Sequence, residues 1–322
     1  MKIFIAGATG VLGRRMVRLL TGGGHQVVCL SRSAANDAEI SAHGGIARTA
    51  DIFDAESLAR AAEGCEVFVH AATAIPAGTK MKPSEWEMND RIRRDGTVAL
   101  STAAAKVGAR GYVQQSVVFV ARPKDQLPFD ENFPVRAEGL YRSSVDAEEL
   151  SREAGVKHGY PVAVLRGAMF YSADSRHTLH FADQLRRRLL PIIDEGDNLM
   201  TLVHADDAAS AFVAATERVR GGLWHITDNE PVTMEAFLNH FAQVIEAKPP
   251  HHVPALLARM AAGDEAVAFM TASTSTNSRK FQSDFGWKPA FPSYREGLHQ
   301  VAEEWKKQST AKDNDKVGLK TQ

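Results

Sequence analysis

The chain has 322 residues, of which 44% are hydrophobic, so it is long enough to bury a large core, and a disordered or fibrous protein is excluded. Its 38 basic and 39 acidic residues leave a formal net charge of −1, which provides no broad field for nucleic acid or a membrane surface. We therefore expect a small-molecule substrate, with no nucleic-acid and no membrane partner.

The first half of the chain alternates short β-branched runs with longer segments whose apolar residues follow helical spacing. A regular succession of strand, helix and strand is typical of an α/β fold, in which a doubly wound parallel sheet is covered on both faces. The predicted strands are 2–6, 26–30, 46–49, 66–70, 112–116 and 161–165.

The pattern is less regular after Arg166 and predicts a smaller, mixed part that binds the substrate. We expect strands at 201–203 and 223–227 and helices at 178–190, 205–218, 233–246 and 293–307. The predicted domains are a first domain over 1–170 to which 200–228 returns, a substrate-binding part made of 171–199 and 229–307, and a disordered polar tail over 308–322.

The two cysteines, Cys29 and Cys65, lie in apolar stretches and are predicted to be buried thiols and not part of a disulfide framework. The apolar run at the N-terminus is broken at Gly7, which is too early for a signal peptide or a membrane span, so we expect a cytoplasmic protein. The histidines show no metal-ligand spacing, so no metal site is expected.

A glycine-rich turn, GATGVLG at residues 7–13, directly follows the first predicted strand and opens the first helix. Gly7 permits the tight turn, Gly10 lets the backbone approach a pyrophosphate, and Gly13 lets the helix pack close to the sheet. This context predicts a dinucleotide site at the helix N-terminus, where backbone N–H groups face the anion. Its predicted residues are Gly7, Thr9, Gly10, Val11, Leu12 and Gly13.

The choice of cofactor is made at the end of the second strand, which reads CLSRS. The stretch offers no carboxylate for a ribose 2′-hydroxyl, whereas Arg32 with Ser31 can bind a 2′-phosphate, helped by Arg14 or Arg15. We therefore predict NADP as the cofactor, with NAD as the alternative.

These features together resemble the short-chain dehydrogenase/reductase superfamily, in its extended or atypical branch, which is NAD-dependent epimerase/dehydratase-like. The resemblance is carried by GxxGxxG at 7–13, ADIFD at 50–54, HAAT at 70–73, LVHADDAASAF at 202–212 and FGWKPAFPSYREGL at 285–298. It implies a Rossmann-type sheet and a homodimer that pairs through helices 83–106 and 140–155. It also implies that Asp51 and Ile52 lie beside the adenine and that Ala71, Ala72 and Thr73 line the cofactor.

In this family a Ser or Thr, a Tyr and a Lys four residues after the Tyr form the catalytic set. The matching positions here are Ser116 in VQQSVVF, Tyr141 in GLYRSSV and, where the lysine is expected, Val145. The resemblance therefore implies that Ser116 and Tyr141 are catalytic, in a site that lacks the usual cation.

A tyrosine without that lysine has an ordinary pKa of about 10, so near neutral pH it is a proton donor and a poor base. We expect an NAD(P)H-dependent oxidoreductase that reduces a carbonyl or conjugated double bond of a small organic substrate, with Tyr141 as proton donor and Ser116 assisting. Alcohol oxidation is expected to be slow. Arg166, at the end of the strand at 161–165, is the candidate for a replacement cation, whereas Arg142 lies on another helix face.

Two alternatives stay open at this point. One is a nucleotide-sugar epimerase or dehydratase, although FYSADS stands where those enzymes carry Tyr-Gly-Pro and epimerisation needs the tyrosine to act as a base. The other is a non-catalytic NADP-binding redox sensor or regulator, which would bind the dinucleotide without turnover.

Overall fold

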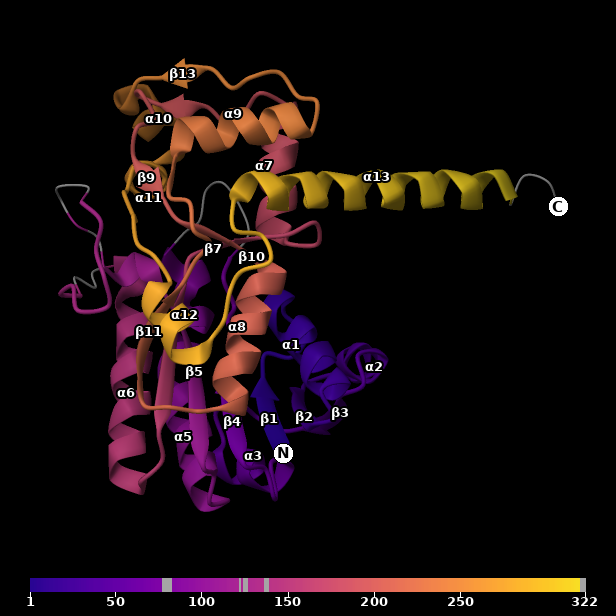
Figure 1. Ribbon diagram of the computed structural model, residues 1–322, viewed down its shortest axis with the longest axis vertical. Coiled ribbons are helices and arrows are strands. Elements are labelled where there is room, and N and C mark those ends of the chain that lie inside the picture. Colours follow the sequence, from indigo (N-terminus) through magenta and orange to yellow (C-terminus); the bar gives the residue numbers. More distant parts are fainter. Residues whose placement is uncertain (77–82, 122, 124–126, 136–138, 319–322) are drawn as a thin grey trace.

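A parallel sheet of seven strands lies at the centre of the larger part of the molecule; the structure, a computed structural model, describes residues 1–76, 83–121, 123, 127–135 and 139–318 (Figure 1). The strand order is β11-β6-β5-β4-β1-β2-β3, and every neighbouring pair is parallel. The chain runs outward from β1 to β3 and then crosses to β4 on the other side, which confirms the predicted doubly wound, Rossmann-type fold. The strands are β1 (Lys2–Ala6), β2 (Gln26–Ser31), β3 (Ile46–Thr49), β4 (Val67–His70), β5 (Gly111–Val117), β6 (Val162–Gly167) and β11 (Gly222–Ile226).

Helices cover both faces of the sheet, because alternate residues of each strand point to opposite sides. In β1, Ile3 and Ile5 belong to a buried cluster that includes residues of α1 and α8, whereas Phe4 and Ala6 belong to a second cluster with residues of α3 and α5. The helices of this part are α1 (Val11–Gly22), α2 (Ala34–Ala42), α3 (Ala55–Ala61), α5 (Thr97–Lys106), α6 (Arg142–His158) and α8 (Ala205–Glu217).

The segment predicted as one helix over 83–106 is divided in the structure. A 3₁₀ turn, η1 (Pro83–Trp86), leads into α4 (Glu87–Arg91), then a π-helical turn, η2 (Ile92–Gly96), and finally α5. A π-helical turn changes the phase of the helix, so it aims its side chains differently from a regular α-helix, and such turns are frequent at functional sites.

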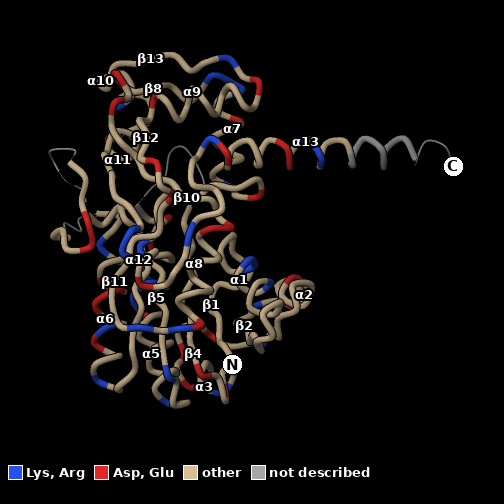
Figure 2. Tube along the Cα trace, viewed as in Figure 1, with Lys and Arg blue, Asp and Glu red and all other residues tan. Residues whose placement is uncertain are grey.

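The smaller part lies over the carboxyl ends of the central strands (Figure 1). Its own buried cluster includes Tyr171, Leu185, Leu202, Phe237 and Leu298. Basic and acidic residues occur in both parts of the molecule (Figure 2). The elements of the smaller part are β7 (Met169–Tyr171), α7 (Arg176–Arg186), β8 (Ile192–Ile193), β9 (Leu199–Met200), β10 (Leu202–His204), β12 (Val232–Thr233), α9 (Met234–Val244), β13 (His252–Val253), α10 (Ala255–Ala262), α11 (Asp264–Met270) and α13 (Tyr294–Gly318).

Two segments differ from the predicted domain limits. Helix α12 (Arg279–Phe285) contacts β11, and its Phe281 and Phe285 join the same core as α1 and α8, so this stretch of 229–307 belongs to the Rossmann-type part. Helix α13 extends to Gly318, so helix continues through most of the segment for which the sequence predicts a disordered tail (Figure 1).

Candidate functional site

The glycine turn between β1 and α1 is packed so closely against other backbone atoms that two of its positions admit no side chain. Gly7 has a φ of +97°, and a Cβ on it would lie 2.5 Å from the carbonyl carbon of Ala71. A Cβ on Gly13 would lie 2.0 Å from the carbonyl oxygen of Gly7. Both glycines are therefore required by the backbone geometry, and Ala71, which is predicted to line the cofactor, lies directly against the turn.

The N-terminus of α1 is built to accept an anion. Its N-cap is Gly10, which provides no side-chain cap, and no acidic residue stands in the first turn. The first backbone N–H groups of a helix have no partner within the helix, and the helix dipole favours negative charge there. Since this end lies where the strand order reverses, between β1 and β4, the residues fit the pyrophosphate of a dinucleotide.

The predicted adenosine side lies at the ends of β2 and β3. Arg32 is exposed at the end of β2 and, within the described part of the chain, forms no ion pair. Asp51 is also exposed, and its carboxylate accepts a 3.0 Å hydrogen bond from the backbone of Phe53, while Ile52 is buried. Ala72 and Thr73 follow β4, at the same edge of the sheet as the glycine turn.

The two arginines after the glycine turn are committed elsewhere, which corrects the expectation that they assist Arg32. Arg15 is buried and binds both carboxylate oxygens of Asp174, at 2.9 and 3.0 Å, and Asp206 at 2.5 Å. Arg14 donates to Asp174 at 2.6 Å. These ion pairs connect α1 to the segment after β7 and to α8.

Ser116, near the end of β5, is 2% exposed and hydrogen-bonded to a buried ion pair. Its hydroxyl donates to Glu148 Oε1 at 2.5 Å. Arg166 donates to the same carboxylate through Nε, at 2.8 Å to Oε1, and through Nη2, at 2.7 Å to Oε2. The hydroxyl proton of Ser116 is thus directed to Glu148, and Arg166 is neutralised by that residue, so it does not supply the replacement cation.

Glu148 was not found from the sequence, which offers two consecutive glutamates in α6. The helical phase distinguishes them, since Glu148 lies three residues after buried Val145 and is itself buried, whereas Glu149 is exposed.

Tyr141 lies directly before α6 and beside the end of β5. Its ring is 5.9 Å from that of Phe119 between centroids, and Phe119 belongs to η3 (Val118–Val120), the turn that follows β5. Val145 is apolar and 6% exposed. Arg142 is exposed and pairs with Asp146 at 2.7 Å, away from the core.

A buried cation lies on η2, in a segment for which the sequence predicts no site residue. Arg93, on η2, is 7% exposed. Burial lowers the pKa of its guanidinium to about 10, and the charges of Asp90 and of Tyr141 act in the opposite direction. Arg93 in turn contributes, after burial, to holding the pKa of His70, the last residue of β4, down to about 4. Arg93 is therefore positively charged near neutral pH.

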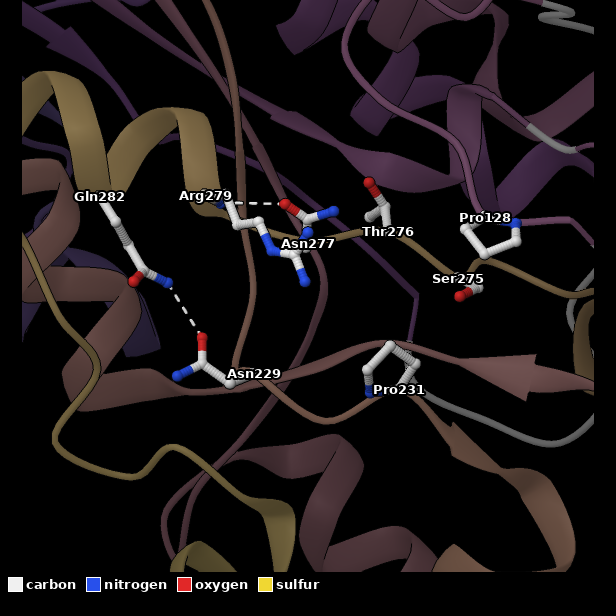
Figure 3. Close-up of a pocket in the computed structure, with 8 residues that line it drawn as sticks. All are labelled: Pro128, Asn229, Pro231, Ser275, Thr276, Asn277, Arg279 and Gln282. Carbon is white, nitrogen blue, oxygen red and sulfur yellow. Dashed lines mark hydrogen bonds between the residues drawn. The ribbon is translucent and has the colours of Figure 1, made fainter.

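A cavity of about 550 Å³ lies on the β11 side of the sheet. Figure 3 shows three segments facing it, and Gln282 donates a 2.9 Å hydrogen bond to Asn229 across it. None of the predicted site residues is among its lining residues, which are Pro128, Asn229, Pro231, Ser275, Thr276, Asn277, Arg279 and Gln282.

The two cysteines are buried, as predicted. Burial raises the pKa of Cys29 to about 12 and that of Cys65 to about 11, so neither is a reactive thiolate. Among the described residues there is no group of histidine, cysteine, aspartate and glutamate side chains that could hold a metal ion. No helix in the described part of the chain has the length and apolar character needed to span a membrane.

Comparisons with known proteins agree with the Rossmann-type fold and its dinucleotide site. The model of the NAD dependent epimerase/dehydratase family matches residues 3–226. The 3-diazoavenalumate denitrifying reductase of a Streptomyces species is 31% identical, over 92% of this chain and 99% of its own. The 2-alkyl-3-oxoalkanoate reductase of Stenotrophomonas maltophilia is 22% identical, over 77% of this chain and 76% of its own.

A solved structure, that of a human epimerase family protein with NADPH, has the same fold. It superposes with a TM-score of 0.79 at 18% identity and covers 94% of this chain and 99% of its own. The chain belongs to the NAD-dependent epimerase/dehydratase family and is an NAD(P)-dependent oxidoreductase of the extended short-chain dehydrogenase/reductase type.

Proposed function

We propose that this oxidoreductase is an NADPH-dependent reductase that acts on a carbonyl or conjugated double bond of a small organic substrate, with Tyr141 as the proton donor. The observation that carries the proposal is the position of Tyr141 beside the end of β5, at the edge of the sheet that also holds the glycine turn. The bound dinucleotide supplies a hydride, and the substrate oxygen that gains negative charge needs a proton. A neutral phenol provides that proton.

For Ser116 we propose a narrower role than the one that the sequence predicts. Its hydroxyl proton is directed to Glu148, so we propose that Ser116 assists by holding the Glu148–Arg166 pair beside the site and not as a second donor to the substrate. Tyr141 then carries the proton transfer alone.

The preference for NADPH over NADH is proposed from Arg32. Its exposed guanidinium at the end of β2 is free of ion pairs in the described chain and can pair with a 2′-phosphate. The variant Arg32→Ala should weaken NADPH binding by about tenfold or more and leave NADH binding nearly unchanged, because a charge-assisted hydrogen bond contributes about 1.5–3 kcal/mol. Fluorescence titration measures the affinity for each dinucleotide. An equal loss of affinity for NADPH and NADH would contradict the proposal that Arg32 binds the 2′-phosphate.

The substrate class is supported by the name of one relative, an oxoalkanoate reductase, which denotes a ketone substrate for that protein. A panel of ketones, aldehydes and enones with NADPH, followed by mass spectrometry of the products, tests it for this chain. Reduced products from the panel are expected, and NADPH binding without turnover on every member would favour the redox-sensor alternative.

A second candidate function follows from the Streptomyces relative, which this chain matches over 99% of that protein's length. That relative is named for denitrifying reduction of a diazo compound. In such a reaction a hydride takes the place of departing N₂, so no proton donor is needed at the reacting atom. Val145, in place of the lysine, is compatible with that chemistry. Gas release from an aryl diazonium compound with NADPH, unaffected by Tyr141→Phe, would favour this candidate over carbonyl reduction.

A further inference from the structure

Three aromatic rings form a row that begins at Tyr141 and crosses from the Rossmann-type part to the smaller part. The ring of Tyr141, the last residue of the 3₁₀ turn η4 (Gly139–Tyr141), lies 5.9 Å from that of Phe119 between centroids. The ring of Phe119 lies 5.7 Å from that of Phe269 on α11. All three residues are half-buried, so this aromatic row of Tyr141, Phe119 and Phe269 is not sealed inside a core.

The turn η3 brings Phe119 out of the core at the end of β5. Its neighbours Val118 and Val120 are fully buried, whereas Phe119 between them is half-buried. The turn reads VFV, so it contributes no polar or charged side chain. The surface that η3 presents beside the phenol of Tyr141 is therefore apolar and aromatic.

Helix α11 directs Phe269 away from the cluster that buries the other side of the helix. Val267 is 1% exposed and packs with Ile193 of β8 and Ala258 of α10. Residues two apart on a helix do not share a face, so Phe269 leaves that cluster and meets Phe119 instead. The smaller part thus supplies one ring of the aromatic row.

The end of α11 is fixed to the smaller part by one buried amide. Asn198, directly before β9, is 4% exposed, and its side-chain nitrogen donates to the carbonyl oxygens of Met270, at 3.1 Å, and Ala272, at 3.2 Å. The two bonds use both protons of the amide. Phe269, one residue before Met270, is therefore carried on a fixed support.

A substrate whose carbonyl reaches Tyr141 meets the aromatic row with the group that the carbonyl bears. Aromatic rings pair in tilted or offset arrangements, and such pairs stabilise a complex beyond the burial of apolar area. We propose that Phe119 and Phe269 are specificity-determining residues, and that the substrate carries a planar aromatic group conjugated to the carbonyl or double bond that is reduced. The inference rests on the proposed role of Tyr141 as proton donor.

A matched pair of enones tests this preference: benzylideneacetone, and its analogue in which a cyclohexyl ring replaces the phenyl ring. The quantity to measure is the ratio of kcat/KM for the phenyl enone to kcat/KM for the cyclohexyl enone, with NADPH. Phe119→Leu and Phe269→Leu keep an apolar side chain but remove a ring, so each should lower this ratio by about 2- to 12-fold. Phe119, which pairs directly with Tyr141, should have the larger effect.

Conservative and control variants separate the ring from a general loss of packing. Phe119→Tyr and Phe269→Tyr keep the ring and should keep the wild-type ratio. Phe133→Leu is the matched control, because Phe133 is also half-buried and its ring lies 5.7 Å from that of Phe129, outside the aromatic row. Its ratio should equal that of the wild type. An unchanged ratio in both Phe119→Leu and Phe269→Leu, or an equal fall in Phe133→Leu, overturns the proposal.

Binding provides a second readout that does not depend on turnover. The affinity of each enone for the protein loaded with NADP is measured by ligand-observed NMR, and the phenyl enone should bind more tightly to the wild type and lose this advantage in Phe119→Leu and Phe269→Leu. Equal affinities of the two enones for the wild type, or no binding of the phenyl enone, would reject the aromatic preference. If one Leu variant does not fold, the other decides.

Failure of the proposed function has a different outcome. Reduction that continues unchanged in Tyr141→Phe would reject Tyr141 as the proton donor, whatever the ratio of the two enones. Loss of reduction in Tyr141→Phe, together with the same ratio in Phe119→Leu, Phe269→Leu and the wild type, would keep the proposed function and reject the aromatic preference.

Discussion

Glu148 receives three hydrogen bonds in a place that solvent does not reach. Its side chain is fully buried, and its partners are Ser116 and two nitrogens of Arg166. Two charges taken out of water are stable only while each has its partner. The group therefore holds β5, β6 and α6 in register behind the site.

The variant Glu148→Gln should lower the free energy of unfolding by about 3–5 kcal/mol, because the guanidinium of Arg166 remains buried without a countercharge. Urea denaturation measures this loss. Glu149→Gln, one residue along the same helix and exposed, is the control and should stay within about 0.5 kcal/mol of the wild type. An equally small effect of Glu148→Gln would show that the pair does not hold the strands.

At the scale of single elements, α1 contains two glycines with opposite surroundings. Gly13 faces the carbonyl oxygen of Gly7 at a Cβ distance of 2.0 Å, whereas a Cβ on Gly22 would meet nothing within 4 Å. The first glycine is required by the approach of the helix to the turn, and the second is not.

Gly13→Ala should destabilise the protein by about 3 kcal/mol or more, since the added methyl group collides with rigid backbone, and it should weaken dinucleotide binding as the helix N-terminus is displaced. Gly22→Ala should be neutral or more stable by up to about 1 kcal/mol. Unfolding curves and NADPH titrations of the two variants check this pair. Equal behaviour of the two variants would contradict the close approach of α1 to the turn.

The strands of the large sheet could be predicted from the sequence because each is a short β-branched run bounded by turn residues; β3, for example, is 46–49 in both descriptions. The sequence predicts no helix at 279–285, and local patterns do not indicate where α12 packs, because Phe281 and Phe285 join a core whose other members come from distant segments. The π-helical turn was missed as well, since IRRD reads as a solvated helical segment.

In the site, the glycine turn follows from local sequence, whereas the neighbours of Tyr141 do not. Ser116 and Tyr141 were identified through the family motif, and Val145 through its spacing. Elements α4, η2 and α6 pack side by side, with hydrogen bonds from Ser143 to Asp90 and from Arg94 to Asp146, and no spacing within one segment encodes this long-range arrangement.

At the scale of the whole molecule, Asp228 lies where the chain leaves β11 for the smaller part. It is fully buried, one carboxylate oxygen accepts from the backbone of Glu230 at 3.2 Å, and the other has no partner among the described residues. Burial raises the pKa of this carboxyl to about 8. The folded protein therefore keeps a proton there that the unfolded chain loses near pH 4.

This proton makes stability depend on pH. Between about pH 4 and pH 8 the folded state binds the proton and the unfolded state does not, so the Asp228 contribution is fully present below pH 4 and declines by up to about 1.4 kcal/mol per pH unit until pH 8. Asp228→Asn should remove this decline. The difference between the unfolding free energies of wild type and variant, measured from pH 4 to 9, isolates it; a difference that is constant across this range would contradict the buried neutral carboxyl.

The role of Tyr141 in reduction is tested most directly by the rate of NADPH-dependent reduction of a substrate found in the carbonyl panel, compared between wild type and Tyr141→Phe at saturating dinucleotide. Loss of a positioned proton donor should lower kcat by about 10²–10⁴-fold while NADPH binding stays unchanged. An unaltered kcat in the variant would contradict the assignment of Tyr141 as the proton donor.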